Sequence, residues 1–560
     1  MKISFKRTFV PLLIVFVLGA GLGLTLDEFS SKEDDTLEQL KKLEDAYILI
    51  NRQYVENVDA ASMTEEAILA MLTKLDPHSS YIDAETMKKV GEEYQGSFGG
   101  IGIWFESPIN DTSKVTSTIP DGPSEAVGLL PGDRLIAVDD SSIVGMGSLD
   151  IQDRIKGPIG TKVKVTVLRP RIKTPIDFEI TRATIPLYSV DAGYMLDETT
   201  GYIRIGRFAM TTHQEFVEHV SRLKQEGMTQ LMLDLRGNPG GIKQTAVMIA
   251  DEMLDGEGVI VSTKGRVERE NEVDRIQPGG LWTKEPVIIL VDESSASGSE
   301  IVAGALQDHD RALIIGRRTF GKGLVQRPFQ MRDGSVIQMT VARYYMPTGR
   351  LIQTPYEIGN FEDYYKDKFQ DYEEATYHPS KYLSEIPDSL HYRTLHGRDV
   401  FGGGGVMPDI VMAPDSTSAL VSRVVQYSIA RGYAFLFASE LFETNGLELR
   451  EKWATKREAF YASFEVDENL WKDYMKYAVE NGFKIGGEST PENPTFTQAE
   501  VDEQKAVLKV IIKARMAQRL YRSEAWYPVF NSIDPLLISA VQKWDDAAKL
   551  AKLSASPATN

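Results

Sequence analysis

Hydrophobic positions along this chain change spacing from one region to the next. Between residues 27 and 90 apolar residues recur at helical spacing among many charges, which predicts an N-terminal helical region. Between residues 91 and 185 short runs alternate apolar and polar residues and are separated by turns, as in Val163–Leu168. This second pattern predicts a compact binding module of small strands with one short helix.

Residues 186–415 contain apolar runs that stand between helix-like segments. Leu231–Leu235, Val287–Val291 and Ala312–Gly316 are each short enough to be a buried strand. Strands that alternate with helices are typical of a layered α/β core. Within the helix-like region before the binding module, Leu75–Tyr81 is interpreted as a helix end followed by a turn.

The last part of the chain, residues 416–560, is predicted to be mostly helical. Gly486–Gln498 interrupts it with Gly, Pro, Ser, Thr and Asn, a composition that indicates a linker or exposed loop. We expect this extension to pack on the core, to form a homo-oligomer or to bind an adaptor.

The first residues show the pattern of an export segment. Lys2, Lys6 and Arg7 precede an apolar run of 18 residues, Phe9–Leu26. Positive charges before such a run stay on the cytoplasmic side, and the run is just long enough to span a bilayer. Residues 1–26 are therefore predicted to be an uncleaved signal anchor, with a cleaved signal peptide as the alternative. The rest of the chain is then expected on the periplasmic side of the cell envelope, anchored in the inner membrane.

Composition removes several functional classes. The net charge of −19 argues against nucleic acid as a partner, because phosphate binding needs clustered Lys and Arg. The chain has no cysteine, which excludes disulfides, thiolate metal sites and a cysteine nucleophile. No metal and no cofactor is expected.

Ser297 is the candidate nucleophile. The strand that ends at Val291 runs through a serine-rich turn into a helix-like stretch, Ser297–Asp308. A side chain at such a turn projects from the first helical turn, where free backbone N–H groups can stabilise an oxyanion. Serine is also a common helix cap, and that is the alternative for this residue taken alone.

Lys322 is the candidate base. His309 lies twelve residues beyond Ser297, about 18 Å along a helix, and cannot reach it. Lys322 stands between two glycines, and burial has to lower its pKa before it can accept a proton. Gln326 can orient the amine without adding a charge. The alternatives are a surface lysine or an anion-binding lysine, and His78 is interpreted as structural rather than as a ligand or base.

Three segments together resemble the C-terminal processing (tail-specific) serine peptidases. They are Leu233–Gly241, Ser295–Asp308 and Gly316–Gln326, and the Leu75–Ser79 segment is similar as well. The family usually has Ala where this chain has Gly298, and this change is expected to be tolerated because only the backbone N–H of that residue is used.

The resemblance implies a crotonase-like layered α/β core, with Ser297 as nucleophile, Lys322 as base and Gln326 as the residue that orients the base. It also implies that the oxyanion is held by the N–H of Gly298 and by that of Gly240 or Gly241, which the sequence leaves open.

Residues 91–185 then resemble the PDZ module of the family, inserted ahead of the core. A loop of clustered N–H groups in such a module captures a peptide carboxylate while the next strand pairs with the peptide. The resemblance assigns this loop to Phe98, Gly99, Gly100, Ile101, Gly102 and Ile103.

The predicted function is an exported serine endopeptidase that cleaves proteins near their C-termini. Its partners are proteins or peptides with accessible C-termini, and the PDZ module feeds or gates the active site. A catalytically silent PDZ scaffold is one alternative, and an acyl-transfer enzyme acting on small molecules is the other.

Overall fold

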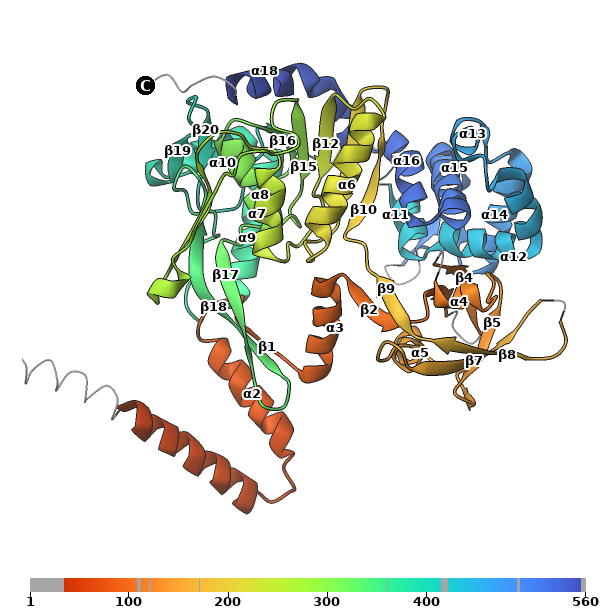
Figure 1. Ribbon diagram of the computed structural model, residues 1–560, viewed down its shortest axis with the longest axis horizontal. Coiled ribbons are helices and arrows are strands. Elements are labelled where there is room, and N and C mark those ends of the chain that lie inside the picture. Colours follow the sequence, from red (N-terminus) through yellow and green to blue (C-terminus); the bar gives the residue numbers. More distant parts are fainter. Residues whose placement is uncertain are drawn as a thin grey trace, which may run out of the picture. The chain divides into compact units, whose positions relative to one another are not determined.

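A computed structural model describes residues 35–554, except for 108–111, 120–121, 171, 360, 414–419, 421 and 491–493 (Figure 1). The chain divides into two compact units, Met1–Leu75 and Asp76–Asn560. The predicted signal segment, residues 1–26, lies outside the described residues. Among the helices that are described, none is long and apolar enough to cross a membrane.

The described part of the first unit is a pair of helices. One covers residues 35–53 and the other, α2, covers Ala60–Leu72. The Tyr47 hydroxyl donates to the Ala60 carbonyl at 3.0 Å, so the first helix is tied to the start of the second. The Asp59 carboxylate caps α2 by accepting the N–H groups of its first turn.

The centre of the second unit is a six-stranded sheet between two helical layers (Figure 1). All of its neighbouring strands are parallel except the first pair. Its order is β10 (Val190–Met195), β11 (Thr200–Ile205), β12 (Gln230–Asp234), β15 (Val287–Val291), β16 (Leu313–Gly316) and β21 (Ile410–Val411). The layered α/β core predicted from the alternating pattern is thereby confirmed.

Alternate residues of these strands face the two helical layers. Leu231 and Leu233 pack in the core cluster that also holds the buried residues of α6 (Thr212–Gln225), α7 (Lys243–Asp251) and α8 (Gly298–Asp308). Met232 points to the opposite face, where α17 (Pro535–Ala540) and α18 (Trp544–Ser554) pack. The end of the predicted helical extension is therefore the second layer of the core.

A smaller sheet of five strands stands beside this core. It contains β1 (Ser80–Ile82), β13 (Val259–Gly265), β14 (Val273–Arg275), β17 (Leu324–Gln330) and β18 (Val336–Tyr345). Strand β1 begins in the stretch interpreted as a turn after a helix end and is extended because it pairs antiparallel with β18, far away in sequence. The elements around the two sheets are α3 (Ala84–Gln95), η1 (Glu268–Glu270), α9 (Phe361–Tyr377), α10 (Pro379–Glu385), η2 (Asp388–Leu390), β19 (His391–Arg393) and β20 (Asp399–Phe401).

The predicted binding module is a separate small β structure with its own core. Its main sheet has the order β3 (Ile103–Glu106), β4 (Ser113–Thr118), β5 (Arg134–Val138), β7 (Lys162–Leu168) and β8 (Ile176–Thr181), with β6 (Ser141–Ser142) paired to β5. Strands β2 (Ser97–Gly100) and β9 (Ala183–Pro186) pair with each other, and α4 (Pro123–Ala126) and α5 (Ser148–Ile155) complete the module. Strand β3 is at the edge of this sheet, and among the described strands only β4 pairs with it.

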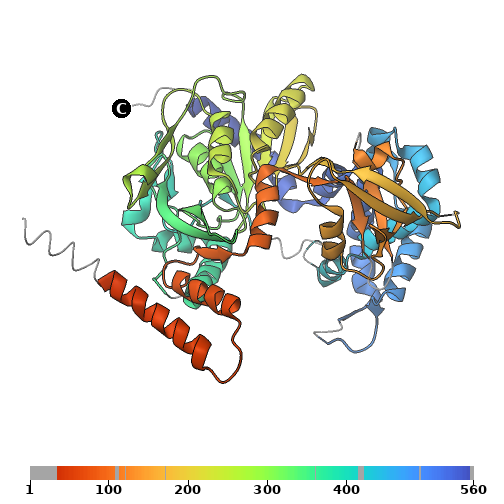
Figure 2. The same cartoon turned by 60° about the horizontal axis from the view of Figure 1, so that its bottom comes forward.

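The segment from residue 423 to 530 forms a helical domain around an aromatic-rich core. Both views place its helices next to the binding module (Figures 1 and 2), and ion pairs such as Lys114–Glu443 join the two. Its elements are α11 (Arg423–Ala430), α12 (Tyr433–Trp453), α13 (Arg457–Ser463), α14 (Glu468–Glu480), β22 (Lys484–Ile485), β23 (Thr495–Phe496), α15 (Gln498–Tyr521), η4 (Ser523–Ala525) and α16 (Trp526–Phe530), and η5 (Asn531–Ile533) and η6 (Val541–Lys543) flank α17.

Candidate active site

Ser297 lies at the junction between the turn after β15 and helix α8. Its φ of 53° and ψ of −108° are unfavourable for a residue with a Cβ. Such strain is maintained only where the surroundings fix the backbone, and it concentrates at functional sites. At the start of α8, Ser297 and Glu300 form a capping box, although the Ser297 side chain makes no hydrogen bond of full capping geometry. The helix-cap interpretation of this serine therefore stands beside that of a nucleophile.

Glu300, in the first turn of α8, fixes the backbone of Ser297. Its carboxylate accepts the Ser297 N–H at 2.8 Å and the Lys322 N–H at 2.9 Å. The other oxygen accepts the Gly321 N–H and the Thr319 hydroxyl, each at 2.6 Å. One fully buried carboxylate thus holds the serine turn and the lysine loop together.

The charge state of Glu300 follows from these contacts. Burial raises its pKa. The four donors act in the opposite direction, because they favour the ionised carboxylate. Thr319 also accepts the Val406 N–H at 2.7 Å, which leaves its hydroxyl proton for Glu300. All four groups donate, so the arrangement fits a carboxylate.

Lys322 follows Gly321 and precedes β17, and its Nζ donates to Oε1 of Gln326 at 2.8 Å. Burial lowers the pKa of Lys322, while the negative charges of Glu300 and Asp76 raise it. The buried Tyr344 hydroxyl contacts the Lys322 carbonyl and lies 3.4 Å from the Ser297 carbonyl. Ser297 and Lys322 are therefore joined through Glu300 and also through Tyr344.

The segment after Leu75 supports the amide of Gln326. Nε2 of Gln326 donates to the carbonyl of His78, which fixes the orientation of the amide and points its Oε1 at the lysine. Asp76 shapes this segment by accepting the N–H groups of His78 and Ser79, both at 2.9 Å. Asp76 also accepts the Thr340 hydroxyl of β18 at 3.1 Å.

His78 lies beside the lysine but is held in a structural role. Burial and the neighbouring Lys322 lower its pKa to about 4, so its ring is neutral at ordinary pH. The ring makes edge contacts with Phe320 and Tyr364 at centroid distances of 6.2 and 5.8 Å. His309, the other histidine considered from the sequence, has Nε2 2.8 Å from the Val259 carbonyl, away from this site.

Phe320, two residues before Lys322, is covered by a second lysine. Nζ of Lys368, on α9, lies 2.8 Å from the Phe320 ring centroid, and this nitrogen has no hydrogen-bond partner among the described residues. Burial lowers the pKa of Lys368 to about 7, with the charge of Glu300 acting against this shift and the charges of Arg318 and Lys322 adding to it. Sequence reasoning missed Lys368, Glu300 and Asp76, although Glu300 stands in the quoted serine motif.

The glycine turn after β12 reaches the nucleophile. A Cβ placed on Gly240 would lie 2.8 Å from the Ser297 Cβ and 2.9 Å from the Gly298 nitrogen. Gly240 donates its N–H to Oδ1 of the buried Asn238 at 2.8 Å. The backbone N–H of Phe208 donates to the Gly240 carbonyl, and the Phe208 carbonyl accepts the Ile242 N–H. This bridge pairs Phe208 with Gly241, whose own amide therefore faces away from Phe208. Among the described residues, the N–H groups of Gly241 and Gly298 have no acceptor.

The predicted carboxylate loop also has free amides. The carbonyls of Ile101 and Gly102 accept the N–H groups of Ser124 and Ile119 at 3.1 and 2.9 Å, whereas their own N–H groups have no acceptor in the described structure. The other loop residues are Phe98, Gly99 and Gly100 in β2 and Ile103 at the start of β3. Within the residues that the structure describes, no cluster of His, Asp and Glu could hold a metal ion.

Comparison with known proteins matches four parts of the chain to family models. Residues 199–359 match peptidase family S41, and residues 114–169 match the PDZ domain. Residues 23–86 match the N-terminal domain of the activating protease CtpB. Residues 424–522 match a family of unknown function, DUF8443.

Several of the similar proteins are proteases. A carboxy-terminal-processing protease of Bartonella bacilliformis is 37% identical over 351 residues, which cover 61% of this chain and 80% of that protein. The carboxy-terminal processing protease CtpA of Bacillus subtilis is 33% identical over 363 residues, covering 63% of this chain and 76% of that protein. A solved structure of a photosystem II D1 C-terminal processing protease is 28% identical and covers 56% of this chain and 83% of that chain, with a TM-score of 0.33.

Proposed function

Because this chain belongs to peptidase family S41 and is a carboxy-terminal-processing serine protease with a PDZ domain, we propose that Ser297 and Lys322 form its catalytic pair. The observation that carries this assignment is the Glu300 carboxylate, which accepts the backbone N–H of both residues. A buried carboxylate that spans two loops in this way holds a nucleophile and a base in one place.

In this mechanism neutral Lys322 removes the Ser297 proton as Oγ attacks the peptide carbonyl. The C–N bond of the tetrahedral intermediate then breaks, and the lysine returns the proton to the leaving amine. Water deacylates the serine ester by the same exchange of a proton with the lysine. Gln326 keeps Nζ oriented without adding a charge that would favour its protonated form.

The oxyanion is assigned to the N–H groups of Gly298 and Gly241. Gly298 is the first residue of α8, where backbone donors have no partner within the helix. Gly241 is favoured over Gly240 because the Gly240 N–H is already bound by Asn238. Donors aimed at the developing charge in a water-poor site are a large contribution to acyl transfer.

The PDZ domain is proposed to bind substrate C-termini and to feed or gate the active site. The free N–H groups of Ile101 and Gly102 fit a carboxylate, and β3 offers an unpaired strand edge for the peptide. An export function for residues 1–26 is also proposed, with the peptidase on the periplasmic side. Its support is the basic cluster followed by the apolar run, Phe9–Leu26.

Two measurements test the catalytic assignment and the role of the PDZ domain. Ser297→Ala and Lys322→Ala should each abolish hydrolysis of an unfolded protein and leave the thermal unfolding transition in place. Full activity in either variant contradicts the catalytic pair. Substrates with an amidated C-terminus should be cut more slowly than their free-acid forms, and equal rates would exclude both PDZ roles.

For the export proposal, a reporter enzyme active only outside the cytoplasm is fused after residue 40. Activity that depends on the basic cluster is expected, and an inactive fusion would contradict export.

A further inference from the structure

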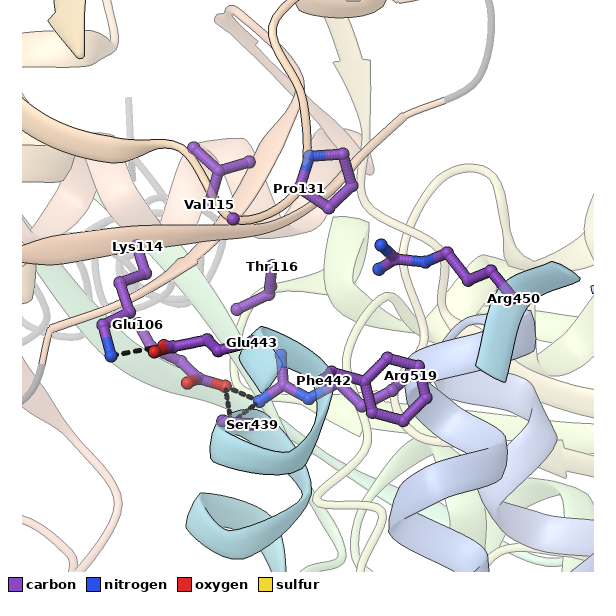
Figure 3. A pocket seen from close by; sticks show the side chains of 11 residues that line it. Glu106, Lys114, Val115, Thr116, Pro131, Ser439, Phe442, Glu443, Arg450 and Arg519 are labelled. Atoms are coloured by element: carbon purple, nitrogen blue, oxygen red, sulfur yellow. Dashed lines mark hydrogen bonds and ion pairs between the residues drawn. The ribbon is translucent and has the colours of Figure 1, made fainter. Parts of the chain in front are cut away.

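The C-terminal extension, residues 423–554, contacts both the PDZ domain and the central sheet. Ion pairs such as that of Glu106 with Arg519 join it to the PDZ domain (Figure 3). Helices α17 and α18 cover one face of the central sheet (Figure 1). Asp534, the residue that caps α17, binds Arg236, two residues after β12. The four matched family segments do not include Asp534, so they assign it no role.

Both the backbone and the guanidinium of Arg236 are bound. Its N–H and its Nε donate to Oδ1 of the fully buried Asp234 at 3.0 and 2.9 Å, and Nη2 donates to Oδ2 at 2.6 Å. Its carbonyl accepts Nη2 of Arg204 at 2.8 Å. Nη1 lies 2.7 Å from Oδ2 of Asp534. Since Asp234 belongs to β12 and Arg204 to β11, Asp534 alone among these partners comes from outside the central sheet.

The residues on either side of Arg236 are bound to the turn that carries the nucleophile. The Gly237 N–H donates to Oδ1 of Asp292 at 2.9 Å. The Leu235 carbonyl accepts the Ser295 hydroxyl at 2.8 Å. Because Arg236 stands between these two contacts, a displacement of Arg236 would be transmitted to the turn after β12 and to the serine turn together.

The rest of the turn after β12 is fitted closely against the nucleophile. The Asn238 carbonyl accepts the Ala296 N–H at 3.0 Å, and Oδ1 of Asn238 accepts the Gly240 N–H at 2.8 Å. A Cβ on Gly240 would lie 2.8 Å from the Ser297 Cβ. The N–H of Gly241 therefore keeps its place beside Ser297 only while this turn keeps its shape.

We propose that Asp534 is a positioning residue for catalysis, which acts through Arg236 to hold the turn that presents the Gly241 N–H to the oxyanion. An oxyanion donor acts on charge that develops in the transition state, so a displaced donor lowers kcat and leaves KM unchanged. The end of the C-terminal extension then supports the reaction itself as well as the fold. This inference rests on the proposed roles of Ser297 and Gly241.

The test uses the full chain with Asp534→Asn. Asparagine caps a helix about as well as aspartate, so this variant keeps the cap of α17 and loses the charge beside Arg236. Hydrolysis of fluorescein-labelled casein gives kcat and KM. A fluorophosphonate probe reports how fast Ser297 is modified, with the phosphonyl oxygen at the oxyanion position. We expect kcat and the labelling rate to fall together by roughly tenfold, less than the loss of a whole donor would cause, with KM unchanged.

A second variant, Arg236→Lys, tests the route of the effect. Lysine keeps a positive charge beside Asp234 but cannot bind two carboxylates as a fork, so kcat should fall. Adding Asp534→Asn to this variant should then lower kcat little further, because both changes break the same contact. The matched control is Tyr194→Phe, which removes the hydroxyl that accepts Nδ2 of Asn531 at 2.8 Å. This contact joins the same extension to β10, so kcat should stay at the wild-type value.

Three results would overturn the proposal. One is an Asp534→Asn variant with a lowered unfolding temperature and the wild-type kcat, as expected of a purely structural contact. Another is an equal fall of kcat in Tyr194→Phe, and the third is a full further loss when Asp534→Asn is added to Arg236→Lys. A wild-type protein that the probe does not label, or labelling that persists in Ser297→Ala, would instead count against the proposed catalytic pair.

Discussion

Nζ of Lys322 donates a hydrogen bond to Oε1 of Gln326 at 2.8 Å, so that an uncharged amide faces the amine. The pair is four residues apart, with Lys322 just before β17 and Gln326 within it. An amide at this distance orients the lysine and leaves its pKa to be set by burial and by the more distant Glu300 and Asp76.

Replacing this amide by a carboxylate should make the base harder to deprotonate. Gln326→Glu puts a negative charge next to Nζ, which favours protonated Lys322 and raises its pKa. The acidic limb of the kcat/KM profile should move to higher pH, and activity below the limb should fall about tenfold for each unit of the shift. Gln326→Met is the control, since it lowers activity without moving the limb upward. An unmoved limb in Gln326→Glu would show that Lys322 is not the titrating base.

Glu300→Gln tests the carboxylate that joins the two loops. In glutamine an NH2 group replaces one of the two carboxylate oxygens. That group donates and cannot accept, so two of the four donors that bind Glu300 lose their acceptor. We expect a loss of stability of about 1–3 kcal/mol from unsatisfied donors. Turnover should fall by at least the roughly hundredfold expected from a misplaced reacting group. Urea unfolding and steady-state kinetics measure the two effects, and a variant with wild-type kcat would remove Glu300 from the catalytic arrangement.

The lowered pKa of Lys368 predicts that the free energy of unfolding depends on pH. Its folded pKa of about 7 lies below the unfolded value, so the unfolded chain binds one more proton between pH 7 and about 10.5. Stability should therefore rise with pH through this window, by up to about 1.4 kcal/mol per pH unit.

Lys368→Met removes the titrating group and should stabilise the protein most near pH 7 and least near pH 10. Chemical denaturation at both pH values checks this. An equal effect at the two values would mean that Lys368 is charged throughout the window in the folded protein.

The contacts of Asp534 predict how much this residue stabilises the C-terminal helices. Its carboxylate binds Arg236 at 2.7 Å and caps α17 by accepting the N–H groups of Leu536 and Leu537. Asp534→Ala removes the cap and leaves a buried guanidinium with one partner fewer, for which we expect a loss of about 2 kcal/mol. The exposed Glu468→Ala, which also removes an acidic ion-pair partner, should cost much less stability than Asp534→Ala, because water screens an exposed ion pair. Equal losses in the two variants would contradict a structural role for Asp534.

Periodicity and motif together predicted much of the core. The apolar runs identified β12, β15 and β16, because strands buried on both faces are continuous in sequence. The resemblance placed Ser297 and Lys322 together, and the short glycine-flanked motifs made that possible. These features are local and appear in a few consecutive residues.

The parts of the fold and of the site that the sequence did not predict depend on partners that are distant in sequence. Strand β1 pairs with β18 across more than two hundred residues, and nothing in Ser80–Ile82 indicates that partner. Lys368 was not foreseen because its surroundings come from another loop, where Phe320 lies. The helical pattern of α17 and α18 was visible, but their position on the sheet was not, since an apolar helix face does not specify which surface covers it.

The position of α17 and α18 has a consequence for how the enzyme matures. These helices cover the sheet face that carries Met232 and Ile288, yet they are synthesised long after the serine and the lysine. A growing chain therefore holds all its reactive groups while one face of its central sheet is still bare. The layered core is therefore completed only when residues 535–554 have been synthesised, after every residue of the candidate catalytic site.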